Sequence, residues 1–424
     1  MKVLVIGSGA REHAIITALL ADDSVEEVVA APGNAGIAQL VATRPVDVTS
    51  AEAVGALAEE LRPDLVVVGP EVPLVAGAAD AVRARGIACF GPSAEAAQLE
   101  GSKAFAKQVM AEAGVPTAMA HVCSTVDEVA AALDQFGAPY VVKDDGLAAG
   151  KGVVVTSDRH DALAHAHACL SRGGDAQVVV EEYLDGPEVS LFAITDGLTV
   201  VPLQPAQDFK RVGEGDAGPN TGGMGAYSPL PWAPADLVAS VTDRVLQPMV
   251  DAMRHRGTPF VGLLYAGLAM TSRGVRVIEF NARFGDPETQ VVLANLRSPL
   301  GQLLMAAATG RLADVPPLAW QSGYAVTVVI AAEGYPASPR TGDIIEGLAD
   351  AAEQVNVDVF HAGTTVTDDG RIASSGGRVL SVTAHGETLA RAREHAYAAV
   401  DLISLTGSHH RRDIARAAAD AAEG

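Results

Sequence analysis

Short apolar runs alternate with amphipathic stretches through the first hundred residues. Each apolar run is a predicted strand closely followed by glycine or proline, and the runs span residues 2–6, 25–30, 65–68 and 87–90. Between them, apolar positions recur at helical spacing in residues 11–20, 50–61 and 75–85. Strands buried on both faces read as continuous apolar runs, so this alternation predicts a doubly wound parallel sheet. Ligands of such sheets bind beyond the carboxyl ends of the strands, which here carry residues 7–12, 32–36 and 69–71.

In the central part the pattern changes to strands joined by glycine-rich turns. Strands are expected at residues 138–143, 152–155, 177–180, 263–270 and 275–281. Residues 230–260 and 293–309 read as helices. Residues 207–227 are too rich in glycine for a helix or a strand, and loops of this kind are usually functional or disordered.

The pattern of the last hundred residues predicts a small α+β domain with no cluster of candidate catalytic or binding residues. We expect this domain to close over sites on the rest of the chain. Its strands are expected at residues 324–331, 358–362 and 378–383, and its helix at 387–405. We therefore expect an α/β and α+β protein of three domains. They are an N-terminal doubly wound domain over 1–101, a central domain over 102–320 with a lid at about 117–190, and a C-terminal α+β domain over 321–424.

Composition narrows the class of protein. With 30 Lys and Arg against 52 Asp and Glu, the net charge of −22 is opposite to that of a nucleic-acid or anionic-membrane binder. The three cysteines, Cys89, Cys123 and Cys169, form no C-x-x-C motif, which fits a reducing cytosol. No apolar run reaches transmembrane length, and the first run reads as a strand rather than a signal segment.

Candidate chemistry is densest at residues 275–290. Side chains alternate along a strand, so one face should carry Val277, Glu279, Asn281 and Arg283, and the other Ile278 and Phe280. A carboxylate and an amide oxygen on one strand face suit a hard cation such as Mg²⁺. Arg283 and Asp286 follow at once, as an anion-binding guanidinium and a further carboxylate. The same pattern is also typical of an edge strand with a solvated polar face.

The first strand–helix turn indicates a phosphate site rather than a dinucleotide site. After Gly7 and Gly9, Glu12 stands where the dinucleotide fingerprint needs its third glycine. A glycine-rich turn at a helix start, with Arg11 beside it, suits a single phosphate. Glu12 and Glu71 are then candidates for ribose hydroxyls or an amine. Ordinary strand–helix turns remain the alternative.

Two lysines and two glycine-rich loops are further candidates. A lysine at a helix start, such as Lys103, is electrostatically unfavourable unless an anion lies nearby. Lys143 is at the end of a strand and precedes a glycine-rich loop that carries Lys151. The loop lacks the spacing of a P-loop, but it can fold over phosphates as a lid, or be a simple surface hairpin. Near residue 181, strand-end backbone beside Leu184 could read an adenine edge and Glu188 could hold ribose hydroxyls, or the segment is a solvated loop. Residues 221–225 form a plausible anion nest, with disorder as the alternative.

Taken together, eight motifs closely resemble the glycinamide ribonucleotide synthetase family, the phosphoribosylamine–glycine ligases of the ATP-grasp superfamily. They are GSGAREHA (7–14), APGNAG (31–36), VGPEVPLV (68–75), FGPSAEAAQLEGSKAF (90–105), VVKDDGLAAGKGVVV (141–155), GPNTGGMGAYSPLP (218–231), IEFNARFGDPETQ (278–290) and GYPASPRTGD (334–343). The resemblance implies an ATP-grasp central domain with a lid. It also implies an early step of purine biosynthesis, in which glycine is joined to 5-phosphoribosylamine at the expense of ATP through glycyl phosphate.

The resemblance also implies roles for individual residues. Mg²⁺ or Mn²⁺ would be bound by Glu279 and Asn281. ATP would be bound by Lys103, Lys143, the 146–152 loop including Gly146 and Lys151, and by Glu181, Glu182, Leu184 and Glu188. Phosphoribosylamine would be held by Gly9, Arg11, Glu12, Asn34 and Glu71. Glycine and the acyl phosphate would be handled by Asp208, Lys210, Thr221, Gly222, Arg283 and Asp286.

The resemblance implies a cytoplasmic enzyme whose partners are its small-molecule substrates, with no nucleic acid or membrane. Because phosphoribosylamine is labile, transient contact with the enzyme that produces it is also an expectation. Two residues depart from the family pattern: Asp144 replaces a small residue beside Lys143, and Phe209 stands where the loop often has His. Residues 265–268 offer no carboxylate for a second metal. The rival interpretations are another ATP-grasp ligase or carboxylase, a non-catalytic nucleotide-binding regulator and a dehydrogenase.

Overall fold

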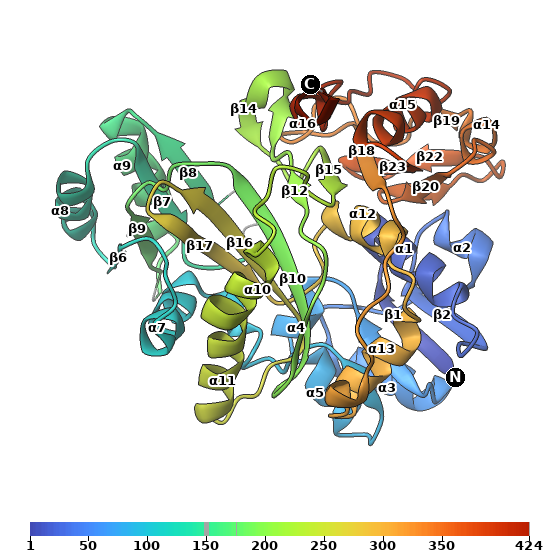
Figure 1. Cartoon of the computed structure of the whole chain (residues 1–424), viewed down its shortest axis with the longest axis horizontal. Coiled ribbons are helices and arrows are strands. Elements are labelled where there is room, and N and C mark those ends of the chain that lie inside the picture. The colour runs from blue at the N-terminus through green and yellow to red at the C-terminus, as the bar shows by residue number, and fades with distance from the viewer. Residues whose placement is uncertain (148–151, 175, 424) are drawn as a thin grey trace.

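The computed structural model describes residues 1–147, 152–174 and 176–423 (Figure 1). Its N-terminal domain confirms the doubly wound sheet, with five parallel strands in the order β3-β2-β1-β4-β5. The strands are β1 (Lys2–Gly7), β2 (Glu27–Pro32), β3 (Ala42–Thr43), β4 (Leu65–Val68) and β5 (Ala88–Phe90). The helices are α1 (Ala10–Leu20), α2 (Ile37–Leu40), α3 (Ala51–Leu61), α4 (Glu71–Val75), α5 (Ala78–Arg83) and α6 (Gln98–Gly101).

The continuous apolar runs of this domain follow from burial on both faces of the sheet. Leu4 and Ile6 of β1 belong to one apolar core, and Val3 and Val5 belong to a second one across the sheet. Alternate side chains of a strand point to opposite faces, so both sets must be apolar. The predicted helix over residues 75–85 is instead two helices, because Gly77 between α4 and α5 adopts a φ of +91°.

Two antiparallel sheets build the central domain. The first sheet, at the left of Figure 1 in the segment predicted to be a lid, has strand order β6-β9-β7-β8 and packs against α8 and α9. Its elements are β6 (Ala120–Cys123), α8 (Val126–Phe136), β7 (Tyr140–Asp144), β8 (Val153–Thr156), α9 (Arg159–Leu170) and β9 (Val178–Glu181). The second sheet has the order β11-β10-β16-β17, from β10 (Glu188–Asp196), β11 (Val200–Pro202), β16 (Val261–Thr271) and β17 (Gly274–Asn281). The other helices are α7 (Lys103–Ala113), α10 (Leu237–Val241), α11 (Gln247–His255), α12 (Glu288–Asn295) and α13 (Leu300–Ala308).

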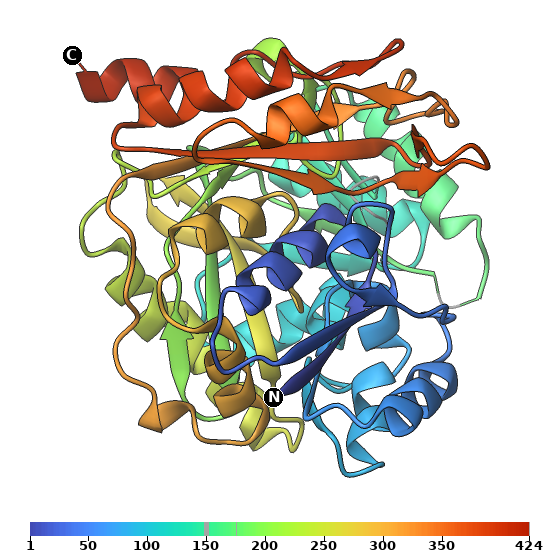
Figure 2. The ribbon, with the colours of Figure 1, turned by 90° about the vertical axis from the view of Figure 1, so that its right-hand side faces the viewer.

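A third antiparallel sheet joins the central segment to the C-terminal one. Its order is β12-β15-β18-β23-β20, and its long strands run across the top of Figure 2, between the C-terminal helices and the N-terminal domain. Its strands are β12 (Gln207–Asp208), β15 (Gly225–Ser228), β18 (Tyr324–Ala331), β20 (Val357–His361) and β23 (Arg378–Gly386). The remaining elements include β13 (Arg211–Gly213), β14 (Ala217–Asn220), β19 (Ile345–Glu346), α14 (Leu348–Ala352), β21 (Thr364–Val366), β22 (Ile372–Ser374), α15 (Leu389–Val400), β24 (Ser404–Leu405) and α16 (Arg416–Glu423).

Three local predictions were wrong. Residues 207–227 are not a structureless loop, because β12 and β15 pair with each other and β13 pairs with β14. The predicted helix over 293–309 is broken between α12 and α13, where Pro299 is the residue before α13. The helical segment at 230–260 begins only at Leu237 and contains a π-helical turn over residues 242–246. Tertiary strand pairing overrode the weak local propensity of the glycine-rich segment.

A β-bulge corrects the predicted faces of the strand at 275–281. In the pairing of β17 with β16, Glu279 lies opposite Gly267, but Val277 lies opposite Leu268, so Ile278 is the extra residue. A bulge shifts the alternation by one residue. Val277 therefore packs in the same apolar core as Phe280 instead of sharing the face of Glu279.

None of the helices in the described ranges is long and apolar enough to cross a membrane.

Candidate active site

The predicted metal strand lies among the predicted lysines. Burial alone would raise the pKa of Glu279, but the charges of Lys210, Lys143 and Lys103 lower it overall. Asn281 lies two residues further along β17, and its Oδ1 is 3.5 Å from Nη2 of Arg283. Within the described part of the chain no group of three or more His, Cys, Asp or Glu side chains could hold a metal ion. Any cation here would be bound by one carboxylate and one amide, with other oxygens supplied by ligands or water.

Lys143 is fixed in position by backbone and carboxylate oxygens. It is buried, and its Nζ lies 3.0 Å from the carbonyl oxygen of Ile278 and 3.0 Å from Oε2 of Glu181. The other Glu181 oxygen is 3.1 Å from Nζ of Lys107. Burial lowers the pKa of Lys107 to about 8, although Glu181 opposes the shift. Lys107 was missed by the sequence analysis because its place in the middle of α7 carries no signal of its own.

The other predicted nucleotide-binding residues have contacts of their own near Lys143 and Lys107. Lys103 donates to the carbonyl oxygen of Gly146 at 3.0 Å, while Lys151 lies outside the described residues. Oε1 of Glu182 accepts from the amide of Met119, and its Oε2 from Arg273 of the β16–β17 turn. Two further residues lie beyond it: Leu184 is half-buried, and the exposed Glu188 is 2.6 Å from Nζ of Lys210.

Arg283 bridges two carboxylates from the preceding part of the chain. Its Nε is 3.1 Å from Glu71, and its Nη2 is 3.0 Å from Glu100, which also accepts from the amide of Ala282. Burial would raise the pKa of Glu71, but Arg283 and then Arg11 lower it to about 2. Burial outweighs Arg283 at Glu100 and raises its pKa. Glu100 was missed because its motif read as a helix start.

The predicted phosphosugar loops are held together by their own side chains. Glu12 is 1% exposed; it accepts from the amide of Gly9 at 2.6 Å and from Nε of Arg11 at 2.5 Å. A Cβ at Gly69 would lie 2.1 Å from this carboxylate, so the close approach requires glycine. Asn34 donates to the carbonyl oxygens of Ser8 and of residue 361 in the C-terminal domain, at 2.8 and 2.7 Å.

Asp286 lies where the three segments of the chain meet. Its Oδ1 accepts from Gln290 at 2.8 Å, and its Oδ2 accepts from Arg378 of β23 at 2.9 Å. A Cβ at Gly9 would lie 3.7 Å from Oδ2, so the phosphosugar loop is adjacent. Burial alone would raise the pKa of Asp286, but Arg378 and then Arg11 lower it, so the side chain stays a carboxylate.

The glycine-rich loop lies against the same aspartate. Thr221 donates to the carbonyl oxygen of Lys210 through its amide at 2.7 Å and its hydroxyl at 2.9 Å. The amide of Gly223 donates to the Thr221 hydroxyl, and a Cβ on Gly223 would lie 2.4 Å from Pro287. The carbonyl oxygen of Gly222 accepts from Arg378. The backbone that was predicted to bind an anion is therefore packed directly on the 286–287 turn.

A buried carboxylate cluster underlies this loop. Oδ1 of Asp208 is buried and has no hydrogen-bond partner among the described residues. Burial, followed by the charge of Glu288, raises the pKa of Asp208. Oε1 of Glu288 accepts from Tyr265 at 2.6 Å and from Ser190 at 3.1 Å. No local motif marked Ser190 or Tyr265, because only the pairing of β10 with β16 brings these two strands together. Glu288 lies in the 278–290 motif but was given no role, because its contacts with both residues depend on where α12 packs.

Structural reasons are visible for both departures from the family pattern. Asp144 is 2.8 Å from the exposed Arg172, which follows the end of α9, whereas Lys143 contacts Glu181 and Ile278. Phe209 packs beneath the guanidinium of Arg411, whose carbon is 5.0 Å from the ring centroid. Arg411 is 1% exposed. Phe209 therefore serves as an aromatic platform for a buried cation.

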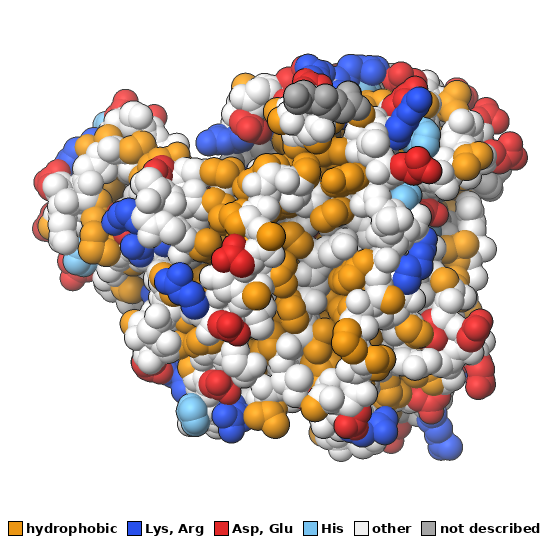
Figure 3. Space-filling view, viewed as in Figure 1, with side chains coloured by type: hydrophobic (Ala, Val, Ile, Leu, Met, Phe, Trp, Pro, Cys, Tyr) orange, Lys and Arg blue, Asp and Glu red, His pale blue; other side chains and the backbone are white. Residues whose placement is uncertain are grey.

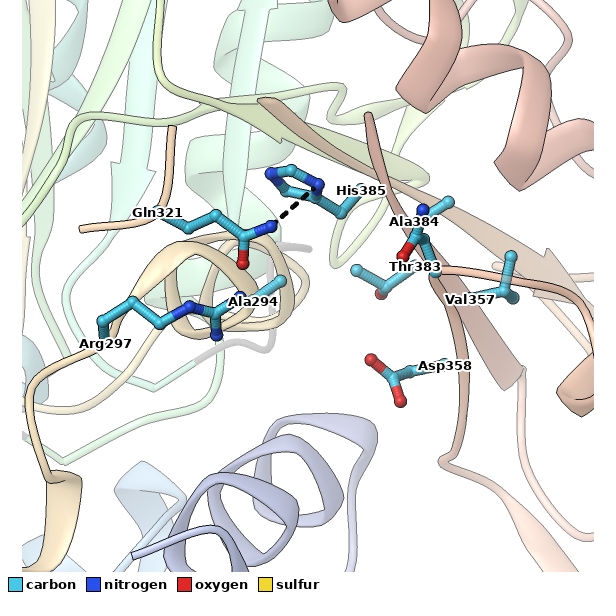
Figure 4. A pocket seen from close by; sticks show the side chains of 9 residues that line it. Ala294, Arg297, Gln321, Val357, Asp358, Thr383, Ala384 and His385 are labelled. Atoms are coloured by element: carbon cyan, nitrogen blue, oxygen red, sulfur yellow. Dashed lines mark hydrogen bonds between the residues drawn. The ribbon is translucent and has the colours of Figure 1, made fainter. Parts of the chain in front are cut away.

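Two surface features lie apart from this cluster. The space-filling view shows the lid lobe at the left, separated by a notch from the C-terminal region above (Figure 3). A cavity of about 360 Å³ opens between the end of α12 and the strands β20 and β23 (Figure 4). Its polar lining includes Arg297, Gln321, Asp358 and His385, and it contains no predicted site residue. The predicted site residues therefore lie outside this cavity.

Comparison with known proteins identifies the family of the chain. The N, ATP-grasp (A) and C domains of phosphoribosylglycinamide synthetase match residues 1–100, 101–289 and 325–417. The chain is 66% identical over 423 residues to the phosphoribosylamine–glycine ligase of Streptomyces coelicolor, covering 99% of this chain and 100% of the relative.

Solved structures show the same fold. The crystal structure of phosphoribosylamine–glycine ligase from Thermotoga maritima matches with a TM-score of 0.84 and 32% identity, over 98% of this chain and 100% of that one. A biotin carboxylase domain from Hydrogenobacter thermophilus, solved with MgADP, shares the fold at 18% identity and a TM-score of 0.70, over 96% of this chain and 91% of that one. The motifs, the three matched domains and the full-length relatives agree, and the chain belongs to the phosphoribosylglycinamide synthetase family of ATP-grasp ligases.

Proposed function

We propose that the residues gathered around β17 and the 286–287 turn carry out the family reaction, the ATP-dependent joining of glycine to 5-phosphoribosylamine in purine biosynthesis. In this scheme the glycine carboxylate attacks the γ-phosphate of ATP and ADP leaves. The amine of phosphoribosylamine then attacks the carbonyl carbon of glycyl phosphate, and inorganic phosphate leaves. The observation that carries the assignment is the convergence of positive charge on Glu279, where Lys210, Lys143 and Lys103 together lower a pKa that burial would raise. The same chain segment continues into Arg283 and Asp286, which are paired with Glu71 and Arg378.

ATP is assigned to the space between the lid and β17. Lys143 and Lys103 would neutralise phosphate oxygens, and Lys107 would hold Glu181 so that Lys143 stays oriented. Glu182 and Leu184 would border the adenine, Glu188 the ribose, and the 146–152 segment with Gly146 and Lys151 the phosphates. Glu279 and Asn281 would hold Mg²⁺ or Mn²⁺, since oxygen ligands suit both ions. Such a cation supplies charge neutralisation on the phosphates.

Phosphoribosylamine is assigned to the N-terminal loops. Gly9 begins α1 and offers a helix N-terminus for the phosphate, and Arg11 adds a positive charge. Glu12 and Asn34 would act by shaping these loops, because their oxygens and nitrogen are already hydrogen-bonded. Glu71 would orient Arg283 toward the acyl group.

Glycine and the acyl phosphate are assigned to the other side of β17. Arg283 carries the positive charge there, and Thr221 and Gly222 supply the backbone that faces the 286–287 turn. Asp286, held as a carboxylate, would accept a hydrogen bond from an attacking amine. Asp208 and Lys210 would complete the charge balance around the acyl group. This chemistry needs positioning and charge neutralisation and no protein nucleophile.

The proposal also covers the partners and the cellular location of the chain. The net charge of −22 favours small-molecule partners and disfavours nucleic acid and anionic membranes. Free cysteines at positions 89, 123 and 169, all buried, fit a cytoplasmic location. Direct transfer of phosphoribosylamine from the enzyme that makes it would protect a labile substrate.

The decisive experiment measures ADP release with glycine, ATP and freshly generated phosphoribosylamine. We expect release that depends on both substrates, together with formation of the glycinamide product. Background release with both present would reject the assignment. Replacing glycine with alanine in the same assay tests whether the acyl site is selective for the small amino acid.

A further inference from the structure

Two side chains of the C-terminal domain hydrogen-bond to the backbone of Gly222 in the 221–225 loop, one to its amide and one to its carbonyl oxygen. The amide of Gly222 donates to Oη of Tyr335 at 3.0 Å, and its carbonyl oxygen accepts from Nη1 of Arg378 at 2.6 Å. A Cβ added at Gly222 would lie 2.9 Å from the guanidinium carbon of Arg378. Only a glycine lets the backbone approach the guanidinium so closely.

The same arginine also fixes the second loop. Nη1 of Arg378 donates to the carbonyl oxygen of Asp286 at 2.7 Å, and Nη2 donates to the Asp286 carboxylate at 2.9 Å. The Arg378 side chain is 22% exposed and that of Asp286 is 14% exposed. Because guanidinium donors lie in one rigid plane, one side chain ties Gly222 and Asp286 to a fixed mutual geometry.

The surrounding sheet makes this arrangement stiff. Gly225 of β15 pairs with Val328 of β18, and the amide of Val329 donates to the carbonyl oxygen of Met224 at 3.0 Å. Arg378 itself begins β23, the next strand of the same sheet. A Cβ at Gly377 would lie 2.4 Å from the Tyr335 ring, so the ring packs directly on the residue before Arg378.

We propose that Arg378 and Tyr335 are positioning residues for glycine and its acyl phosphate, which they serve by clamping Gly222 and Asp286 from the C-terminal domain. This inference rests on the proposed assignment of glycine to those two loops. Neither side chain needs to touch the reacting atoms. The clamp sets where Asp286 and the backbone of residues 221–223 stand relative to Arg283.

The test compares the KM values of the three substrates in single and double variants. Tyr335→Phe removes one hydrogen bond and keeps the ring, and it should lower kcat/KM for glycine by about 3- to 10-fold. Arg378→Met should lower it by about 100-fold, since small misplacements of reacting groups have costs of that size. Arg378→Lys should recover part of the loss. In every variant the KM for ATP should change by less than about twofold.

A double variant and a control variant show whether the losses come from the clamp. The double variant Tyr335→Phe, Arg378→Met should lose less than the product of the single losses, because both residues act on Gly222. Arg371→Met is the matched control, because Arg371 lies in the same domain and pairs with Asp369 at 2.7 Å on an exposed hairpin. It should leave all three KM values unchanged. Should Arg378→Met fail to fold, Tyr335→Phe alone decides the matter.

The Asp286→Asn variant distinguishes a failure of the clamp from a failure of the assignment of glycine to the two loops. If Asp286→Asn lowers kcat/KM for glycine but Tyr335→Phe and Arg378→Met do not, the clamp is wrong and the glycine assignment stands. If Asp286→Asn leaves glycine kinetics unchanged, the assignment itself fails and the clamp fails with it. Equal increases in the KM values for glycine, ATP and phosphoribosylamine in the clamp variants would show a general structural role and would overturn the proposal.

Discussion

Replacing Arg283 with Met should destabilise the chain by an amount that depends on pH. Arg283 lies between Glu71 and Glu100, whose side chains are 23% and 8% exposed. Removing one partner of a buried ion pair leaves uncompensated charge and typically costs about 3–5 kcal/mol. The pKa of Glu71 gives a second figure: burial raises it, but Arg283 and then Arg11 lower it from 4.5 to about 2, which corresponds to about 3 kcal/mol.

The direction of the pH effect follows from the lowered pKa of Glu71. A group whose folded pKa lies below its unfolded pKa contributes its full stabilisation above the unfolded value, and loses it as the pH falls through the folded value. The contribution of Glu71 is therefore complete above about pH 5. It falls to about 2 kcal/mol at pH 3.5. The difference between the native chain and the Arg283→Met variant should shrink in the same range.

Thermal unfolding at several pH values is a suitable assay. For 424 residues that unfold as one unit, an entropy near 2.1 cal/mol/K per residue converts 3 kcal/mol into a Tm shift of about 3–4 °C. Arg85 provides a matched control, because it also bridges two carboxylates, Glu52 and Glu59, but these are 80% and 71% exposed. Arg85→Met should cost less than about 1 kcal/mol. A Tm difference for Arg283→Met that stays constant from pH 7.5 to 3.5, or equals that of Arg85→Met, would refute the reasoning.

Three further variants test other parts of the site. Glu279→Ala should reduce turnover more than about 1000-fold with an unchanged circular dichroism spectrum, and activity retained at saturating Mg²⁺ would exclude Glu279 from a metal site. Asp144→Ala removes an ion pair with Arg172, whose side chain is 61% exposed, so kcat should stay within about twofold; a large loss of kcat would bring Asp144 into the ATP site. Phe209→His should cost about 1 kcal/mol in urea unfolding through weaker stacking on Arg411, and a rise in kcat would instead give the imidazole a role in the chemistry.

Sequence reasoning could predict the features whose signal is local. The β1 and β4 runs predicted a parallel sheet because both faces of that sheet are buried. Glu279 and Asn281 could be proposed together because both lie on one short strand segment. The bulge at Ile278 could not be foreseen, since it depends on the register with β16, and the predicted face of Val277 was wrong for that reason.

The residues that were missed act across long separations in the chain. Arg378 was predicted as the first residue of a strand, yet its guanidinium reaches Asp286 and Gly222 in the central segment. Lys107 and Glu100 sit in helical segments whose partners come from β9 and from the residues after β17. No spacing within a single motif encodes such contacts. Only the packing of the three segments brings these charges together.

The sheet shared by β12, β15, β18, β23 and β20 has a consequence for how the chain matures during synthesis. A ribosome completes β12 and β15 long before it makes β18, with helices α10 to α13 in between. Until β18 emerges, β15 has an open edge and Gly222 lacks both Tyr335 and Arg378. Pairing over such a separation in sequence is slow to form. A nascent chain can thus assemble the sheets β6-β9-β7-β8 and β11-β10-β16-β17 early, but the sheet that holds the 221–225 loop is completed only when the C-terminal segment has left the ribosome.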